Sequence, residues 1–153
     1  MTGTIGSGKT TFAKKLSKNK KSVIFLIDHS IRQLGVPIKS VQDYDQCYQG
    51  VTKIISDLAI QILKLGQSVV LDFGGNVGQW DWLSAISDQG KANIEIFHLM
   101  APIETRKRRV LQRNMEPEEF KFSEQEFASM PTVSAAPDVK REGLKITLVN
   151  TVE

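Results

Sequence analysis

A glycine-rich segment near the start of the chain limits its fold more than any other feature. Residues 3–10 read Gly-Thr-Ile-Gly-Ser-Gly-Lys-Thr and match G-x-x-x-x-G-K-[ST], the pattern of a phosphate-binding loop, or P-loop. Glycines let the backbone curl so that successive N–H groups point at one anion, and the helix expected from Lys9 adds its positive N-terminal end. The segment predicts a nucleoside triphosphate site. A flexible Gly/Ser turn is the plainer alternative.

Each position of such a loop has an expected role. The Lys9 ammonium reaches the β- and γ-phosphates, and the Thr10 hydroxyl ligates Mg²⁺. We therefore expect ATP and Mg²⁺ as cofactors. The residues predicted to hold the nucleotide are Gly3, Thr4, Ile5, Gly6, Ser7, Gly8, Lys9, Thr10 and Thr11.

The strand that should lead into the P-loop is short of residues. Only Met1 and Thr2 stand before the loop, whereas a strand needs about five residues. In P-loop folds this strand is central, and without it two neighbouring strands keep unpaired backbone groups. Our hypothesis is that the sequence lacks residues upstream and that Met1 is the tail of a truncated first strand. The alternative is a complete start at Met1, with another segment in the gap.

Size and composition fit one ordinary domain. The 153 residues are 41% hydrophobic and 24% charged, which is enough for a real core. The net charge of +3 suits an anionic ligand but falls short of the basic stripe of a duplex-binding protein. One cysteine, Cys47, argues against a disulfide framework and fits a reducing, cytoplasmic location. No apolar stretch approaches the roughly 20 residues that cross a bilayer, so no membrane partner is expected.

Apolar runs and helical periodicity alternate along the chain. Strands are predicted at residues 22–27, 68–71, 94–99 and 145–149, with helices from Lys9 and over 51–65, 80–87 and 102–113. The 51–65 helix presents on one face Val51, Ile54, Ile55, Leu58, Ile62 and Leu65. Ser40 and Asp43 resemble a capping box, and residues 115–142 read as a partly ordered surface stretch. The pattern predicts an α/β fold of three layers, with helices on both faces of a mainly parallel sheet.

Two aspartates follow predicted strands, at the edge where ligands of parallel sheets bind. Asp28 could position an acceptor hydroxyl and take its proton, as phosphoryl transfer requires. A cap on the following turn is its structural alternative. Asp72 stands where a Walker B aspartate would hold Mg²⁺ through water. Its alternatives are a contact with substrate, or capping of the turn beside Gly74 and Gly75.

The 102–113 helix is strongly basic. Its arginines Arg106, Arg109 and Arg113 share one side, and no acidic residue after Glu104 balances them. Three guanidiniums on one face suit a triphosphate and the charge that develops in transfer. A solvated basic face is the alternative. A separate sector of the helix is apolar and holds Ile103, Val110 and Leu111.

The remaining histidines and tryptophans are predicted to be mainly structural. His98 falls inside a strand, and His29, next to Asp28, should point away from it. Trp80 and Trp82 are expected to pack, although Trp80 could also stack on a substrate ring.

Together these stretches resemble the small P-loop kinase family that includes zeta toxins, chloramphenicol phosphotransferase, gluconate kinase and the 5′-kinase domain of polynucleotide kinases. The likeness rests on residues 2–11, on 28–35 (Asp-His-Ser-Ile-Arg-Gln-Leu-Gly), on 69–72 (Val-Val-Leu-Asp) and on 101–104 (Ala-Pro-Ile-Glu) with Arg109 and Arg113. Residues 122–127 followed by Pro137 are similar to the family's segment before its last strand. The resemblance implies one AAA-type, nucleoside-kinase-like domain over residues 1–153, with a basic lid over about 102–130.

The resemblance also implies roles for single residues. Asp28 matches a catalytic base, Arg109 and Arg113 match arginines that clamp the nucleotide phosphates, and Arg32 matches a position that faces substrate. The sequence after Asp72 reads Phe-Gly-Gly-Asn and matches no single acceptor.

The leading hypothesis is a kinase that moves the γ-phosphate of ATP to a hydroxyl of a small molecule. Lys9 would act with the clamp arginines on the phosphates, and Asp28, Arg32 and Asp72 would face substrate. A polynucleotide 5′-hydroxyl kinase is disfavoured by the weak net charge, because a polynucleotide groove gains affinity from many phosphate contacts. A regulatory ATPase without an acceptor and an inactive remnant are the rivals from other classes.

Overall fold

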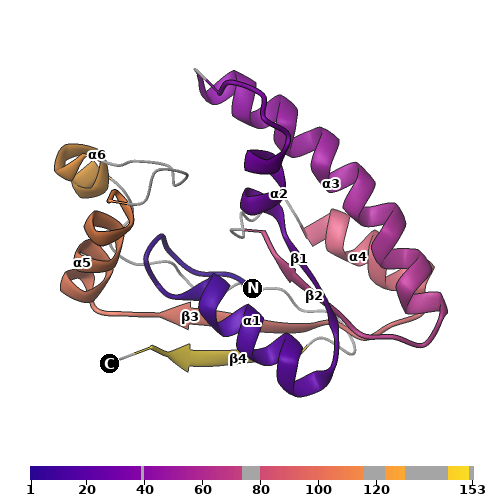
Figure 1. Ribbon diagram of the computed structural model, residues 1–153. Coiled ribbons are helices and arrows are strands. Elements are labelled where there is room, and N and C mark those ends of the chain that lie inside the picture. Colours follow the sequence, from indigo (N-terminus) through magenta and orange to yellow (C-terminus); the bar gives the residue numbers. More distant parts are fainter. Residues whose placement is uncertain (39, 74–79, 116–122, 130–144, 152–153) are drawn as a thin grey trace.

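The computed structural model describes residues 1–38, 40–73, 80–115, 123–129 and 145–151, and shows an α/β fold (Figure 1). The helices are α1 (Lys9–Lys20), α2 (Ile27–Gln33), α3 (Val41–Lys64), α4 (Trp80–Gly90), α5 (Ile103–Arg113) and α6 (Glu124–Ser129). The strands are β1 (Val23–Leu26), β2 (Val69–Asp72), β3 (Glu95–Met100) and β4 (Lys145–Asn150). All the predicted strands and helices are present, and their ends move by a few residues, except that α3 begins at Val41, before the predicted start at Val51.

The strands form two parallel pairs, with Val23 of β1 opposite Val69 of β2 and Glu95 of β3 opposite Lys145 of β4. The first two residues of the chain lie between the pairs. The Met1 nitrogen donates to the carbonyl oxygen of Leu71 at 2.8 Å, and Thr2 forms a parallel bridge with His98. The spatial order is therefore β1, β2, Met1–Thr2, β3, β4, so the residues before the P-loop occupy the predicted central position.

A cavity of about 240 Å³ separates β2 from β3. The edges of both strands line it, through residues 69–71 and 95–97, and Met1 and Thr2 stand at one end. Residues of the covering helices also line it, among them Leu16 of α1 and Leu83 and Ile86 of α4. Because the strands are parallel, the cavity lies where a further strand leading into Thr2 would run.

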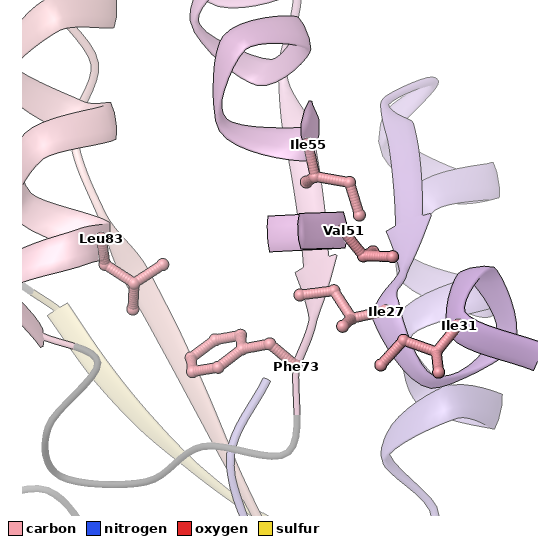
Figure 2. Packing of buried hydrophobic residues seen from close by; sticks show 6 residues of the cluster. All are labelled: Ile27, Ile31, Val51, Ile55, Phe73 and Leu83. Atoms are coloured by element: carbon pink, nitrogen blue, oxygen red, sulfur yellow. The ribbon is translucent and has the colours of Figure 1, made fainter. Parts of the chain in front are cut away.

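Apolar side chains fill both faces of the strands. On one face, Ile27 and Ile31 of α2 pack with Val51 and Ile55 of α3, with Phe73 after β2, and with Leu83 of α4 (Figure 2). On the other face, a second cluster is built from Met1, Ala13, Val70 and Leu99. Neighbouring strand residues alternate between the clusters, as strand geometry requires. The predicted layers of helix, sheet and helix follow from this arrangement.

The predicted apolar face of α3 is only partly buried. Val51 and Ile55 are buried, but Ile54, Leu58 and Leu65 are 61%, 43% and 79% exposed. The helix lies in the outer layer and packs on α2 and α4, so a narrow stripe that continues to Ala59 is enough to meet its neighbours. The predicted cap is present, because Ser40 Oγ accepts a hydrogen bond from the Asp43 nitrogen at 3.1 Å. Among the residues that the structure describes, no helix is long and apolar enough to cross a bilayer.

Candidate functional site

The P-loop, residues 3–10, joins the central Met1–Thr2 segment to α1. Gly3, Gly6 and Gly8 all have positive φ, at 132°, 76° and 89°. A Cβ on Gly3 would stand 2.3 Å from the carbonyl oxygen of Leu99, and one on Gly6 would stand 2.7 Å from that of Arg106. Glycine is therefore required at Gly3 and Gly6 because a side chain would collide with neighbouring backbone, which the motif alone does not indicate. The outer side of the loop is pressed against β3 and α5, with no room for a side chain.

Lys9 lies within the loop, with its Nζ donating to the carbonyl oxygens of Gly3 and Thr4 at 3.0 Å each. Burial lowers the pKa of Lys9, and the carboxylates of Asp72 and Asp28 act in the opposite direction. Both predicted acidic site residues therefore lie close enough to act on the loop lysine.

Asp72 is the last residue of β2, and its buried carboxylate accepts a hydrogen bond from Thr10 Oγ1 at 2.6 Å. These are the two residues predicted to hold Mg²⁺. No group of three or more His, Cys, Asp or Glu that could hold a metal ion occurs among the residues that the structure describes. A hydroxyl beside one carboxylate fits Mg²⁺, which keeps several waters and takes further ligands from nucleotide phosphates. Thr10 and Asp72 thus fit such an ion in chemistry and position.

Asp28 lies in the first turn of α2 because β1 ends at Leu26, earlier than predicted. The side chain is exposed, and its Oδ1 accepts a hydrogen bond from the Tyr44 hydroxyl at 2.7 Å. No side chain caps α2 at Leu26, its N-cap residue, so the capping alternative gains no support. Arg32, four residues on, falls on the same side of α2 and is half-buried.

Arg106 lies on the same loop-facing side of α5 as Arg109, and it contacts the backbone of the loop. It is only 1% exposed, and its Nε donates to the carbonyl oxygen of Ile5 at 2.9 Å. Its guanidinium carbon also lies 5.5 Å from the ring centre of Phe127 on α6. In the predicted apolar sector Val110 is buried, whereas Ile103 is 43% exposed. Arg106 thus supplies a hydrogen-bond donor to a carbonyl of the loop.

Arg109 also contacts the loop backbone. Its Nη1 donates to the Gly6 carbonyl oxygen and to Thr151 Oγ1, both at 3.2 Å. Thr151 Oγ1 in turn donates to the Ser7 carbonyl oxygen at 2.7 Å, so the residue after β4 ties α5 to the P-loop. No local signal in the sequence marks Thr151. The charge of Arg113 lowers the pKa of Lys9, which places this arginine near the loop too.

Other candidates lie apart from the loop or outside the described residues. His98 is buried, with Nδ1 2.9 Å from Thr2 Oγ1, and His29 is exposed. Trp80 packs against the core cluster and Trp82 lies edge-on to Phe73, as expected for structural residues. Gly74 and Gly75 lie outside the described residues, as does most of the predicted 115–142 stretch apart from Met115 and residues 123–129.

The AAA domain family model AAA_33 matches residues 1–137 of the chain, which include the P-loop, both aspartates and α5. The chain belongs to this AAA domain family. Among curated proteins, no sequence matches this AAA domain.

Solved structures resemble the AAA domain in fold. A candidate kinase from Chloroflexus aurantiacus J-10-fl has a TM-score of 0.76 at 15% identity, covering 97% of this chain and 85% of its own. A sugar kinase from Janibacter sp. HTCC2649 has a TM-score of 0.58 at 16% identity, covering 97% of this chain and 82% of its own. At such identities the likeness shows the fold, and that fold is the predicted P-loop kinase-like one.

Proposed function

We propose that this AAA domain is an ATP- and Mg²⁺-dependent phosphotransferase that moves the γ-phosphate to a hydroxyl of a small molecule. One observation carries the proposal. Two carboxylates act on Lys9, and Thr10 engages only one of them, Asp72. The second, Asp28, has an exposed side chain that an acceptor could reach. The fold that the chain shares with a candidate kinase and a sugar kinase supports the same reaction class.

Each residue then has one task in the transfer. Asp28 takes the proton of the acceptor hydroxyl as that oxygen bonds to the γ-phosphorus. The bond from the γ-phosphorus to its bridging oxygen breaks, and ADP leaves. Lys9, Arg109 and Arg113 stabilise the negative charge on the phosphate oxygens. Thr10 and Asp72 would hold Mg²⁺, which when bound would supply neutralisation of phosphate charge.

Arg109 needs a change of partners to do this, since its guanidinium bonds to the loop and to Thr151. A triphosphate in the loop offers it stronger, charge-assisted bonds than the carbonyl of Gly6 does. Arg32 and Asp28 share one side of α2 and would together face the acceptor. We propose a sugar, a nucleotide-sugar or an antibiotic hydroxyl as the acceptor class, and a cytoplasmic setting.

The decisive experiment offers a pool of small metabolites and MgATP to the protein and follows the gain of one phosphate by mass spectrometry. The Asp28→Asn variant, run in parallel, controls for contaminating kinases. A product that needs both ATP and Asp28 is the expected result. Steady ATP hydrolysis that ignores added metabolites would indicate a regulatory ATPase instead. Failure of MgATP to raise the melting temperature would indicate an inactive remnant, since tight binding must raise it.

A further inference from the structure

We infer that Tyr44 is a positioning residue for the proposed base, holding the Asp28 carboxylate by one oxygen so that the other is aimed at the acceptor. The inference rests on the proposed function and adds a residue that neither the P-loop motif nor the basic helix indicates. It starts from a single contact between two helices. The Tyr44 hydroxyl donates to Asp28 Oδ1 at 2.7 Å.

The two residues stand on rigid supports. Asp28 lies in the first turn of α2, which the buried side chains of Ile27 and Ile31 fix to the core. Tyr44 lies in the first turn of α3, and its nitrogen donates to the carbonyl oxygen of the N-cap Ser40 at 3.2 Å. A helix start fixed by its cap has little freedom to rotate. The contact therefore joins two defined backbones.

An exposed aspartate without such a partner samples several rotamers, and only some of them face an acceptor. The hydrogen bond selects among them. It occupies Oδ1 and leaves Oδ2 to receive the acceptor proton. Positioning of this kind contributes to rate because the reacting groups must approach within a narrow range of distance and angle.

The surroundings of Tyr44 keep its hydroxyl protonated, so that it remains a hydrogen-bond donor. Burial raises the pKa of its phenol, and the negative charge of Asp28 and the hydrogen bond to that carboxylate raise it further. The hydroxyl consequently stays protonated at neutral pH. It can donate to the carboxylate throughout the range in which a kinase works.

Tyr48 provides a matched control one turn further along α3. Its ring centre lies 6.0 Å from that of Tyr44, but its hydroxyl donates to the carbonyl oxygen of Phe73 at 3.2 Å. The chain has 2 tyrosines in all, so these two phenols can be told apart with single variants. Loss of the Tyr48 hydroxyl should affect packing, whereas loss of the Tyr44 hydroxyl should affect Asp28.

The test compares Tyr44→Phe, Tyr48→Phe and Asp28→Asn in the full chain. MgATP and a small-metabolite extract are the probes, and the rate measured is total phosphate transferred to the extract and to water. We expect Tyr44→Phe to lower kcat about tenfold with little change in KM for ATP or in melting temperature. Tyr48→Phe should lower the melting temperature and leave kcat within about twofold.

A second readout follows the contact without turnover. In protein carrying ¹³C-labelled tyrosine, the ring-carbon resonance of Tyr44 next to its hydroxyl should move in Asp28→Asn, while that of Tyr48 stays. An unmoved Tyr44 resonance, or a Tyr44→Phe kcat within about twofold of the parent, overturns the inference. An Asp28→Asn variant that keeps full kcat overturns the proposed base instead. If the parent chain transfers no phosphate, the proposed function and the positioning role fall together.

Discussion

Arg106 of α5 donates a hydrogen bond from its Nε to the carbonyl oxygen of Ile5 across 2.9 Å. This contact holds the loop through its backbone, because the acceptor is a carbonyl oxygen of the loop itself. Phe127 of α6 covers the same guanidinium. Arg106 therefore supports the backbone of the loop and connects it to α6.

Replacing Arg106 should lower both the stability of the fold and the affinity of the loop for ATP. In Arg106→Met the half-buried carbonyl of Ile5 loses a charged donor, so we expect the free energy of unfolding to fall by about 1–3 kcal/mol. Affinity for ATP should fall with it, because the loop is no longer held in shape. Urea unfolding and ATP titration measure the two effects. Arg108→Met, at an exposed position of the same helix, is the control. A loss of ATP affinity at unchanged stability would mean that Arg106 contacts phosphate after all.

Lys9→Met should remove nucleotide binding yet leave the nucleotide-free protein at least as stable as the parent at neutral pH. Burial lowers the pKa of Lys9, so its charged form is held in the fold at a cost. The sign follows from linkage. The unfolded chain binds more protons than the native one, so the free energy of unfolding rises as pH increases through the lowered pKa towards the ordinary value of 10.5.

Thermal unfolding of Lys9→Met with and without MgATP checks both statements. At ATP concentrations of about 100 times Kd, the parent should gain about 2.7 kcal/mol and the variant none. The alkaline rise in stability should shrink in the variant. A variant that is clearly less stable at neutral pH would contradict this reading of Lys9.

Asp28→Asn should abolish transfer while sparing nucleotide binding. The amide keeps the size of the side chain but cannot take the acceptor proton, so we expect kcat to fall by about 10²–10⁴-fold. ATP-induced stabilisation should stay, because Asp28 does not touch the loop backbone in any hydrogen bond described above. Asp45→Asn changes an exposed carboxylate close by on α3 and should leave both quantities unchanged. Full turnover in Asp28→Asn would remove this residue from the mechanism.

Two isoleucines test where α3 meets the core. Ile31 of α2 is 1% exposed in the cluster of Figure 2, so Ile31→Ala should lower the free energy of unfolding by about 2–5 kcal/mol. Ile54 of α3 is 61% exposed, and Ile54→Ala should change the free energy of unfolding by no more than about 0.5 kcal/mol. Urea denaturation of both variants gives the comparison. A large loss at Ile54 would mean that another surface covers α3.

The cavity between β2 and β3 should accept an added strand. A five-residue apolar extension such as Val-Ile-Val-Val-Leu ahead of Met1 would run between the two strand edges and pair with both. We expect the free energy of unfolding to rise by about 1–3 kcal/mol through new hydrogen bonds and burial. An extension of equal length that carries Pro and Asp is the control, since it can neither pair nor fill an apolar space. Equal stability of the two extended proteins would show that the cavity takes no strand.

Local patterns were enough to predict the P-loop, the helix from Lys9, the cap at Ser40 and the parallel strands. Each depends on residues within a few positions of one another, and the period of the apolar residues separates strand from helix. The placement of Asp28 and Asp72 also follows, because carboxyl ends of parallel strands share one edge. The charges of both aspartates raise the pKa of Lys9 against the effect of burial.

Contacts between distant parts of the chain were decided only by the tertiary structure. A helical wheel shows that Arg106 and Arg109 share one side of α5, but it does not show which part of the chain lies against that side. In the folded protein both arginines contact carbonyl oxygens of the P-loop. The pairing of Tyr44 with Asp28 and the position of Thr151 likewise join separate segments. Periodicity reports which residues face the same way, whereas burial and hydrogen-bond partners depend on the surface that the folded chain brings against them.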